Sequence, residues 1–407
     1  MAKQIDSIVD KTADFPHSVD LGLVIPAELV GDVVGKLHYV SEKLAGFQIA
    51  DSNRTVHFRL RAGSEDQLDT VALRLREVAT KVCRSYRSRG ESILVSQPGA
   101  PSGYSQDPHQ PLEAEGQLHR YGNGRYGLGP HLVALVEGFD RQFLKAVRPF
   151  LPEAHQFPSI VGGDLLSRCR YIKSFPHSLS LVQHLREDLE AIQDFAEQAD
   201  WQDGHLKVAP GSLAQPETLL SPTVCFHCYA WLADSRQTRP RIITARGKCF
   251  RFESGNLRGL ERLWDFSMRE MIFVGPKEFI LEQRKKVIEA CAGLLDRWKL
   301  SYEIKTATDP FFIDDFSQQS AFQRAFDLKF EVRAALPYRP GSSVAIGSFN
   351  IHQDFFGRSF SISSIDGQPV HTGCVGFGLE RVALAVVAQH GPNPADWPAN
   401  LRADLVE

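Results

Sequence analysis

The chain has 407 residues, of which 43% are hydrophobic and 23% are charged, with a formal net charge of -3 and seven cysteines. This length favours two domains, and the near-neutral charge argues against a protein that binds nucleic acid over its whole surface. The start lacks an apolar signal core, and no stretch approaches the roughly 18 apolar residues of a membrane span. Because the scattered cysteines do not resemble a secreted disulfide framework, we expect a cytoplasmic globular protein without membrane association.

The first hundred residues predict a small domain in which strands and helices alternate. Apolar residues recur at helical spacing after a first strand, and Ser64, followed by two acidic residues, marks the start of a second helix. Strands are expected at 19–25, 56–60 and 92–96, and helices at 27–44 and 64–82. This β-α-β-α-β pattern, roughly ferredoxin-like, predicts a small α/β sandwich-like accessory domain over residues 1–96.

Basic residues gather toward the end of the second expected helix. They are Arg74, Arg76, Lys81, Arg84, Arg87 and Arg89. One interpretation is a surface that meets an acidic carrier protein or RNA. The other is a solvated helix face whose positive charge suits the negative end of the helix.

A run rich in proline, glycine and serine, residues 97–116, predicts a linker before a larger domain over 117–407. Strands in the larger domain are expected at 241–244, 271–274 and 359–362, and helices at 130–147, 276–298 and 379–389. Strands that are dense in the middle of the domain, with long helices outside them, predict an α+β fold. Its core would be a mainly antiparallel sheet flanked by helices.

Two short stretches more than a hundred residues apart have the chemistry of a phosphate site. In 250–253, Arg251 and Glu253 alternate along an expected strand, so both side chains would leave the same face. In 376–381, Arg381 stands just inside a helix behind an expected glycine turn. Each stretch alone is as readily a solvated ion pair or a fold feature. Together they favour a phosphate anion held between two planar guanidinium groups.

In these stretches and around Glu270, the chain resembles the class II aminoacyl-tRNA synthetase catalytic domain. It is most similar to atypical seryl-tRNA synthetases and to amino acid:[carrier protein] ligases. The likeness covers residues 117–407. Helix 130–147 with Phe157-Pro158-Ser159-Ile160 resembles the first family motif, which builds a dimer interface in such enzymes, so the resemblance implies a homodimer. The second motif resembles 249–253 with 262–266, and the third resembles 376–381.

The resemblance also implies a role for each motif residue. Arg251 would contact the α-phosphate of ATP and bridge to the amino acid carboxylate, and Arg381 would lie near the γ-phosphate; these are the two expected catalytic residues. Glu253 and the backbone of Leu263 would read the adenine, with Phe266 stacked beneath it, although Phe266 alone is most simply a core residue. The remaining expected ATP contacts are Arg262, Gly347, Ser348, Phe349 and Asn350. Magnesium on the phosphates would help the arginines stabilise the charge that gathers at phosphorus.

A metal site is a further expectation. Cys225 and Cys228 form a Cys-x-x-Cys pair, but no second pair for a zinc ribbon is evident. The resembling families hold zinc with two cysteines and a glutamate, and Cys225, Glu270 and Cys374 stand at those positions. An open fourth position would bind the substrate's α-amino group. The alternative is that the two cysteines are buried free thiols. If this stretch is a strand, alternation turns Cys228 to the face opposite Cys225 and leaves His227 on the same face as Cys225.

The expected activity is ATP-dependent, AMP-forming activation of a small amino acid, which the resemblance implies to be glycine or alanine. The acceptor would be the phosphopantetheine thiol of a carrier protein, because 373–381 and 389–398 look more like the ligases than the synthetases. The long helical hairpin that holds tRNA in ordinary seryl-tRNA synthetases is not predicted. A divergent aminoacyl-tRNA synthetase that charges tRNA remains the alternative. A non-catalytic amino acid or RNA sensor is a third, and the joint presence of Arg251, Glu253 and Arg381 argues against it.

Overall fold

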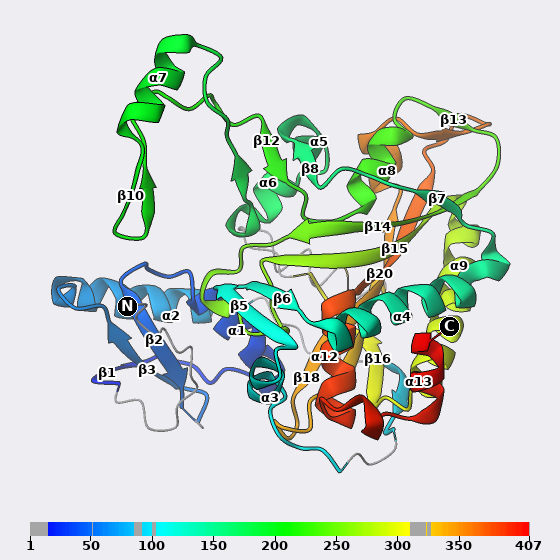
Figure 1. Cartoon of the computed structure of the whole chain (residues 1–407), viewed down its shortest axis with the longest axis horizontal. Coiled ribbons are helices and arrows are strands. Elements are labelled where there is room, and N and C mark those ends of the chain that lie inside the picture. Colours follow the sequence, from blue (N-terminus) through cyan, green and yellow to red (C-terminus); the bar gives the residue numbers. More distant parts are fainter. Residues whose placement is uncertain are drawn as a thin grey trace.

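An eight-stranded sheet forms the centre of the molecule (Figure 1). A computed structural model describes residues 15–50, 52–84, 92–99, 103–309, 323 and 327–406 of the chain. In sheet order the strands are β4 (Ile93–Gln97), β16 (Tyr302–Thr306), β17 (Lys329–Ala335), β18 (Ser343–Gln353), β20 (His371–Gly378), β15 (Asp265–Gly275), β14 (Arg241–Phe250) and β7 (Glu153–His155). All neighbours pair antiparallel except β14 and β7, which confirms the predicted mainly antiparallel sheet.

Three long helices pack on one face of this sheet and confirm three predicted spans. They are α4 (Pro130–Val147), α9 (Lys277–Arg297) and α12 (Leu379–His390). Their apolar sides bury Phe139 and Val287 against Val375 and Phe377 of β20 in the main core. Because successive side chains of a strand point to opposite faces, Cys374 points away from these helices. The polar residues described below lie on that second face.

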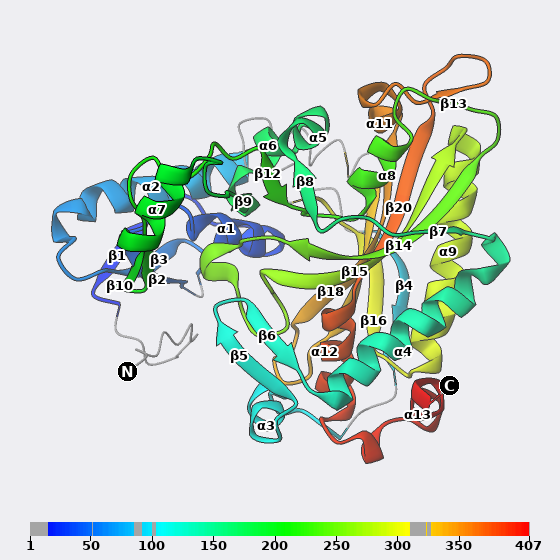
Figure 2. The same ribbon diagram turned by 45° about the horizontal axis from the view of Figure 1, so that its top comes forward.

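Shorter elements cover the second face around a smaller core. They include β8 (Ile160–Gly162), α5 (Gly163–Arg168), α6 (Tyr171–Ser174), β9 (Leu181–Val182), β12 (Thr218–Leu220), α8 (Cys225–Trp231), β13 (Arg236–Gln237), α11 (Phe355–Ser359) and β19 (Ser363–Ser364). Figure 2 shows α5, α8 and α11 along the upper edge of the view. The strand predicted at 359–362 is wrong, because Phe360 and Ile362 follow α11 and are buried in this core without strand pairing.

An arm extends from this side of the molecule, at the upper left of Figure 1. It consists of α7 (Leu189–Gln198) and a hairpin of β10 (Asp200–Gln202) and β11 (His205–Lys207). A second hairpin, β5 (Leu118–Gly122) with β6 (Arg125–Leu128), precedes α4, and α13 (Ala399–Val406) closes the described chain. Among the described residues, no helix has the length and apolarity that crossing a membrane requires.

The described residues up to Arg84, which we call the N-terminal domain after the proposed division, form a three-stranded sheet with two helices. Its elements are β1 (His17–Asp20), α1 (Val30–Leu37), β2 (Leu44–Ile49), β3 (Thr55–Leu60) and α2 (Leu68–Arg84), with the strand order β1-β3-β2. This is a ferredoxin-like arrangement without its last strand. The expected helix over 27–44 is too long, because α1 ends at Leu37 and Leu44 already begins β2, a strand that was not predicted.

The strand predicted at 92–96 exists as β4, but it does not belong to the N-terminal sheet. Its backbone pairs with β16 at the edge of the central sheet. The predicted linker over 97–116 also contains α3 (His109–Ala114), whose Leu112 is fully buried in the main core. The division at 96 and 116 therefore stays a proposal, and the strand nearest to the first boundary joins the two parts of the chain.

The basic residues of α2 are partly used inside the N-terminal domain. Arg74 donates to the carbonyl oxygen of Val40 at 3.3 Å, and Arg76 donates to that of Asp20 at 2.9 Å. Arg87, Arg89 and the side chain of Arg84 lie outside the described residues. The proposed binding surface thus stays a prediction.

Candidate functional site

Two groups of predicted residues come together on the second face of the central sheet. We call Cys225, Glu270 and Cys374 the thiol corner, and Arg251, Glu253, Arg262 and Arg381 the arginine corner. They originate from segments up to 156 residues apart, from Cys225 to Arg381. The pairing of β15 with β20 and the loop after β14 brings them to one site.

The thiol corner is assembled by one helix and two adjacent strands. Cys225 begins α8, Glu270 lies in β15, and Cys374 lies in β20, where it pairs with Ile272 two residues beyond Glu270. Glu270 and Cys374 therefore share a face of the sheet. The two sulfurs and a carboxylate oxygen all lie within 4.8 Å of one another, and all three residues are buried.

The carboxylate of Glu270 is only half satisfied. Its Oε1 accepts hydrogen bonds from the hydroxyl of Thr223 at 2.7 Å and the backbone N–H of Val224 at 3.1 Å. Its Oε2 is buried and has no hydrogen-bond partner among the described residues. Burial, and then the neighbouring Cys374, raises the pKa of Glu270 to about 7. A buried carboxylate oxygen of this kind, beside two sulfurs, is a group of donors that suits a cation.

The two thiols are linked by a hydrogen bond. That bond raises the pKa of Cys225 well above its usual value and lowers the pKa of Cys374 well below its usual value. Asn350 donates to the Cys374 sulfur at 3.4 Å, and His352 Nε2 lies 3.7 Å from the same atom. These contacts leave the corner rich in soft and anionic donors, which is the donor chemistry that zinc prefers.

Sequence reasoning missed His352. Its Nδ1 lies 3.1 Å from the hydroxyl of Thr372, so the ring is held beside the thiol corner. Spacing offered a signal, because His352 stands two residues after Asn350 on β18 and such residues share a strand face.

The argument that separated Cys228 from Cys225 assumed a strand, and the structure does not have a strand there. The stretch that contains it is helix α8 rather than a strand, so Cys228 lies about one turn beyond Cys225 and is fully buried. His227 Nε2 lies 3.0 Å from the carbonyl oxygen of Ile160, and its ring stacks on Phe157 with centroids 6.0 Å apart. Neither residue belongs to the thiol corner.

Three residues of the arginine corner, Arg251, Glu253 and Arg262, lie in a loop, which corrects the expected strand at 250–253, whereas Arg381 lies in α12. The pairing of β14 with β15 ends at Phe250 and Asp265, and the chain between them forms a loop that the Arg251 N–H closes on the Trp264 carbonyl oxygen at 2.9 Å. Arg251 Nε donates to the Pro222 carbonyl oxygen at 3.0 Å. Its guanidinium lies 5.4 Å from the centre of the Phe266 ring, a cation–π distance.

Charges in this corner are mutually paired. Arg262 makes a hydrogen-bonded ion pair with Glu253. Burial acts to raise the pKa of Glu253, but the charges of Arg262, Arg381 and Arg251 outweigh it and lower that pKa. Burial, followed by the charge of Arg262, lowers the pKa of Arg381 to about 10, which still leaves it protonated at neutral pH. Arg381 Nη1 donates to the Ala345 carbonyl oxygen at 3.0 Å.

The glycines before Arg381 do not form the predicted turn. Gly376 and Gly378 are part of strand β20, and α12 begins directly at Leu379. A Cβ on Gly376 would lie 2.9 Å from the Met268 side chain and 3.4 Å from that of Glu270. A side chain at this position would therefore displace the end of the Met268 side chain and contact that of Glu270.

The other predicted ATP contacts divide between the site and the core. Ser348 and Asn350 lie on the site face of β18 and are hydrogen-bonded to each other at 3.0 Å. The side chain of Phe349 points into the main core and is fully buried, so the predicted contact with ATP could come only from its backbone. Gly347 leaves space for the Phe377 ring, which would lie 2.7 Å from an added Cβ. The Leu263 side chain is buried in the main core, and the role of its backbone stays a prediction.

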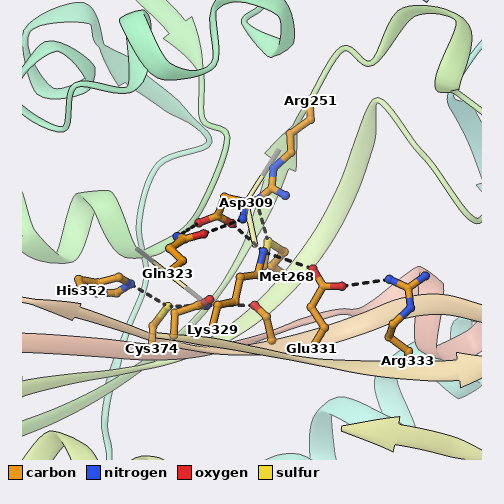
Figure 3. A network of polar contacts seen from close by, with 11 residues as sticks. Arg251, Met268, Asp309, Gln323, Lys329, Glu331, Arg333, His352 and Cys374 are labelled. Atoms are coloured by element: carbon orange, nitrogen blue, oxygen red, sulfur yellow. Dashed lines mark hydrogen bonds and ion pairs between the residues drawn. The ribbon is translucent and has the colours of Figure 1, made fainter. Parts of the chain in front are cut away.

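A buried ion network lies between the two corners (Figure 3). Lys329 Nζ contacts Asp309 Oδ1 at 2.6 Å and Glu331 Oε1 at 3.3 Å, and Glu331 in turn accepts from Arg333 at 3.0 Å. Gln323 donates to the other oxygen of Asp309 at 2.7 Å. The sequence signal was three charged residues at alternate positions of β17, which is unusual for a strand in the middle of a sheet.

Comparisons with known proteins agree with this geometry. The family described as the tRNA synthetase class II core domain (G, H, P, S and T) matches residues 212–390. Amino acid--[acyl-carrier-protein] ligase 1 of Bradyrhizobium diazoefficiens is 32% identical over 258 residues, covering 61% of this chain and 75% of the ligase. Ligase 2 of that organism is 31% identical over 313 residues, covering 74% of this chain and 90% of the ligase. The chain belongs to the class II aminoacyl-tRNA synthetase family.

Within this class II family, the chain is also similar to a type-2 serine--tRNA ligase of Methanopyrus kandleri. The two are 26% identical over 293 residues, which is 68% of this chain and 55% of the relative. A solved M. kandleri SerRS, in complex with A. aeolicus tRNASec, has a TM-score of 0.68 at 20% identity, covering 95% of this chain and 76% of that one. This structure confirms the class II fold that the sequence motifs predicted.

Proposed function

We propose that the chain activates a small amino acid with ATP and transfers it to the phosphopantetheine thiol of a carrier protein. The observation that carries this proposal is the thiol corner and the arginine corner on the same face of a class II sheet. The first can hold an amine through a metal, and the second suits the phosphates of a nucleotide. Carrier-protein ligases among the relatives support the choice of acceptor.

The residues of the thiol corner fit zinc. Two sulfurs and the unsatisfied Oε2 of Glu270 would provide three ligands, which leaves a fourth tetrahedral position open. Bound zinc would supply a Lewis acid that holds the substrate's amine in its neutral form. Asn350 and His352 would orient the sulfur of Cys374 through the contacts already described.

The arginine corner would act in the first step. A carboxylate oxygen of the amino acid attacks the α-phosphorus of magnesium-bound ATP, and the bond to pyrophosphate breaks. Arg251 would neutralise the charge that gathers at the α-phosphate, and Arg381 would contact the phosphates from the other side. Glu253 and Arg262 would position the adenine, with Phe266 beneath it. The product is an aminoacyl adenylate, and no protein nucleophile is needed.

The second step would transfer the acyl group. The sulfur of phosphopantetheine attacks the carbonyl carbon of the adenylate, the bond to the AMP oxygen breaks, and a thioester forms while the thiol proton passes to solvent. Glycine and alanine are the proposed substrates. A cytoplasmic location is part of the proposal, and it is supported by seven cysteines that are all free thiols.

Amino-acid-dependent exchange between ATP and pyrophosphate tests the first step. We expect exchange with glycine or alanine on zinc-loaded protein, and its absence with every amino acid would sink the proposal. A cognate carrier protein bearing phosphopantetheine tests the second step, with the thioester detected by intact-protein mass spectrometry. ATP binding without adenylate formation would instead support a non-catalytic sensor.

Charging of tRNA is a second candidate. It is favoured by the fold match to the seryl-tRNA synthetase solved with tRNA, because that match covers 95% of this chain and therefore includes most of the N-terminal domain. Aminoacylation of total tRNA with radiolabelled amino acid, run beside the carrier-protein reaction, separates the two acceptors. Transfer to tRNA without thioester formation would replace the carrier-protein proposal.

A homodimer is the proposed assembly. Ile160, in the segment that resembles the first family motif, and Trp231 are 49% and 67% exposed although they are large and apolar. Trp231 packs edge-on against His155, with ring centroids 5.3 Å apart. Light scattering after size exclusion should give twice the 45.5 kDa chain mass, and Trp231→Asp should shift the protein toward monomer.

A further inference from the structure

The N-terminal domain contacts the loop over residues 251–264, which carries Arg251, Glu253 and Arg262 of the arginine corner. The contact is made by the carboxyl end of α1 and the residues after it, 35–39. Asn256 Nδ2 donates a hydrogen bond to the Gly35 carbonyl oxygen at 3.2 Å. Asn256 belongs to a short 3-10 turn, Ser254–Asn256, which begins directly after Glu253. A displacement of this turn would therefore move the Glu253 carboxylate.

The approach at Gly255 is unusually close. A Cβ placed on Gly255 would lie 2.5 Å from Nδ1 of His38 and 3.2 Å from Cε1 of the same ring. The φ angle of Gly255 is not positive, so its backbone conformation is open to alanine and only the neighbouring ring excludes a side chain. The His38 ring itself packs against Phe47 of β2, with centroids 4.8 Å apart. This packing limits how far the ring can retreat.

A second contact connects residues 35–39 to the beginning of the loop through His177 and Ser178. The Tyr39 ring meets the His177 ring edge-on, with centroids 5.2 Å apart. The next residue, Ser178, accepts a hydrogen bond from the Phe252 N–H at 3.1 Å. Burial, and then the charge of Glu253, raises the pKa of Tyr39 to about 12, in agreement with a phenol close to that carboxylate. The beginning of the loop is thus enclosed by residues 35–39 on one side and by His177 and Ser178 on the other.

We propose that the N-terminal domain is a positioning element of the ATP site, which holds the 251–264 loop through residues 35–39 so that Glu253 and Arg262 are ready to receive adenine. This inference rests on the proposed function, because it assumes that the loop binds ATP. It gives the domain a role within the chain that needs no macromolecular partner. A displacement of the N-terminal domain would therefore change the affinity for ATP through the contacts of residues 35–39 with the loop.

The test adds a single methyl group at the contact. Gly255→Ala should raise the KM for ATP in pyrophosphate exchange about tenfold, which corresponds to about 1.4 kcal/mol of lost binding. The kcat should change much less, because Arg251 lies four residues away and is fixed by its bond to Pro222. The double variant Gly255→Ala/His38→Ala should restore the KM, since removal of the ring makes room for the methyl group.

Gly31→Ala is the matched control, because Gly31 lies on α1 and its added Cβ would meet nothing within 4 Å. Its KM for ATP should equal that of wild type. Hydrogen exchange of peptides over 252–264 gives a readout besides activity: exchange should rise in Gly255→Ala and return to the wild-type level in the double variant. If Gly255→Ala does not fold, Asn256→Ala tests the same contact by removing the bond to Gly35.

The outcomes separate the two proposals. Wild-type protein without exchange activity would refute the proposed function, whatever the variants do. Active wild type with an unchanged KM for ATP in Gly255→Ala would overturn the positioning role. A raised KM that His38→Ala does not restore would also overturn it, since the methyl group would then disturb the loop itself rather than its contact with the domain.

Discussion

The thiol corner and the arginine corner differ in how their charges are satisfied. In the arginine corner each guanidinium has a protein acceptor: Arg251 bonds to the Pro222 carbonyl, Arg381 to the Ala345 carbonyl, and Arg262 to the Glu253 carboxylate. In the thiol corner one carboxylate oxygen of Glu270 is buried beside two sulfurs and has no hydrogen-bond partner in the described part of the chain. The first corner can keep its geometry before any ligand binds. We expect the geometry of the second to depend on a bound cation.

The comparison predicts that a substitution in one corner leaves ligand binding by the other corner intact. The largest effect on activity is expected in the thiol corner. Cys374→Ala should remove zinc and abolish exchange activity, a loss of more than about a thousandfold, because the substrate amine loses its anchor. Metal content by mass spectrometry and ATP binding by calorimetry check this. ATP should still bind, since the arginine corner does not depend on Cys374.

Cys228→Ala is the matched control for this variant. Cys228 lies on the same helix as Cys225 and is fully buried, but it is outside the ligand group. It should keep its zinc and its activity, with at most a modest loss of thermal stability from the smaller side chain. Full zinc occupancy in Cys374→Ala would refute the proposed ligands.

The next largest effect should come from Arg251. Arg251→Gln removes the charge that faces the α-phosphate, so kcat for exchange should fall about a hundredfold to a thousandfold. Arg251→Lys should recover only part of this loss, because an ammonium keeps the charge but not the planar pair of donors. Zinc content should stay at the wild-type level in both variants. Loss of zinc in Arg251→Gln would show that the corners are not independent.

Removal of zinc from the wild-type protein should also lower its stability, and this change is smaller than the losses of activity above. A metal that binds only the folded state stabilises it by about 4 kcal/mol at a thousandfold excess over its Kd, so a chelator should lower the Tm by several degrees. ATP without metal should shift the Tm much less. Differential scanning calorimetry measures both shifts. An unchanged Tm after complete zinc removal would mean that the thiol corner is satisfied without a cation.

The sequence predicted the parts of this site that depend on local pattern or on motif residues. Helix α12 was predicted closely because its apolar run is long and begins at a glycine. Arg251, Glu270 and Cys374 were found through the family motifs. The short apolar run at Cys225 could have been a strand or a helix, since a run of this length has no decisive period, and the structure makes it helical.

Other features depend on contacts between distant segments, which a single sequence does not reveal. Strand β4 belongs to the central sheet rather than to the N-terminal sheet, because its backbone pairs with β16. The alternating charges of Lys329, Glu331 and Arg333 were visible, but their burial follows from the position of β17 inside the sheet. The contact of His38 with Gly255 joins residues more than two hundred positions apart, so it required the structure.

The smallest of these effects concerns adenine recognition at the edge of the arginine corner. Glu253→Gln keeps the size of the side chain but removes the charge that pairs with Arg262, so the loop should lose order. The KM for ATP should rise a few-fold to about tenfold, whereas kcat should change less, because the residue contacts the base rather than the reacting phosphorus. Steady-state exchange at varied ATP measures both constants. An equal loss in kcat with unchanged KM would instead place Glu253 at the reacting centre. Glu253 would then not differ in role from Arg251 and Arg381, which contact the phosphates in the proposed mechanism.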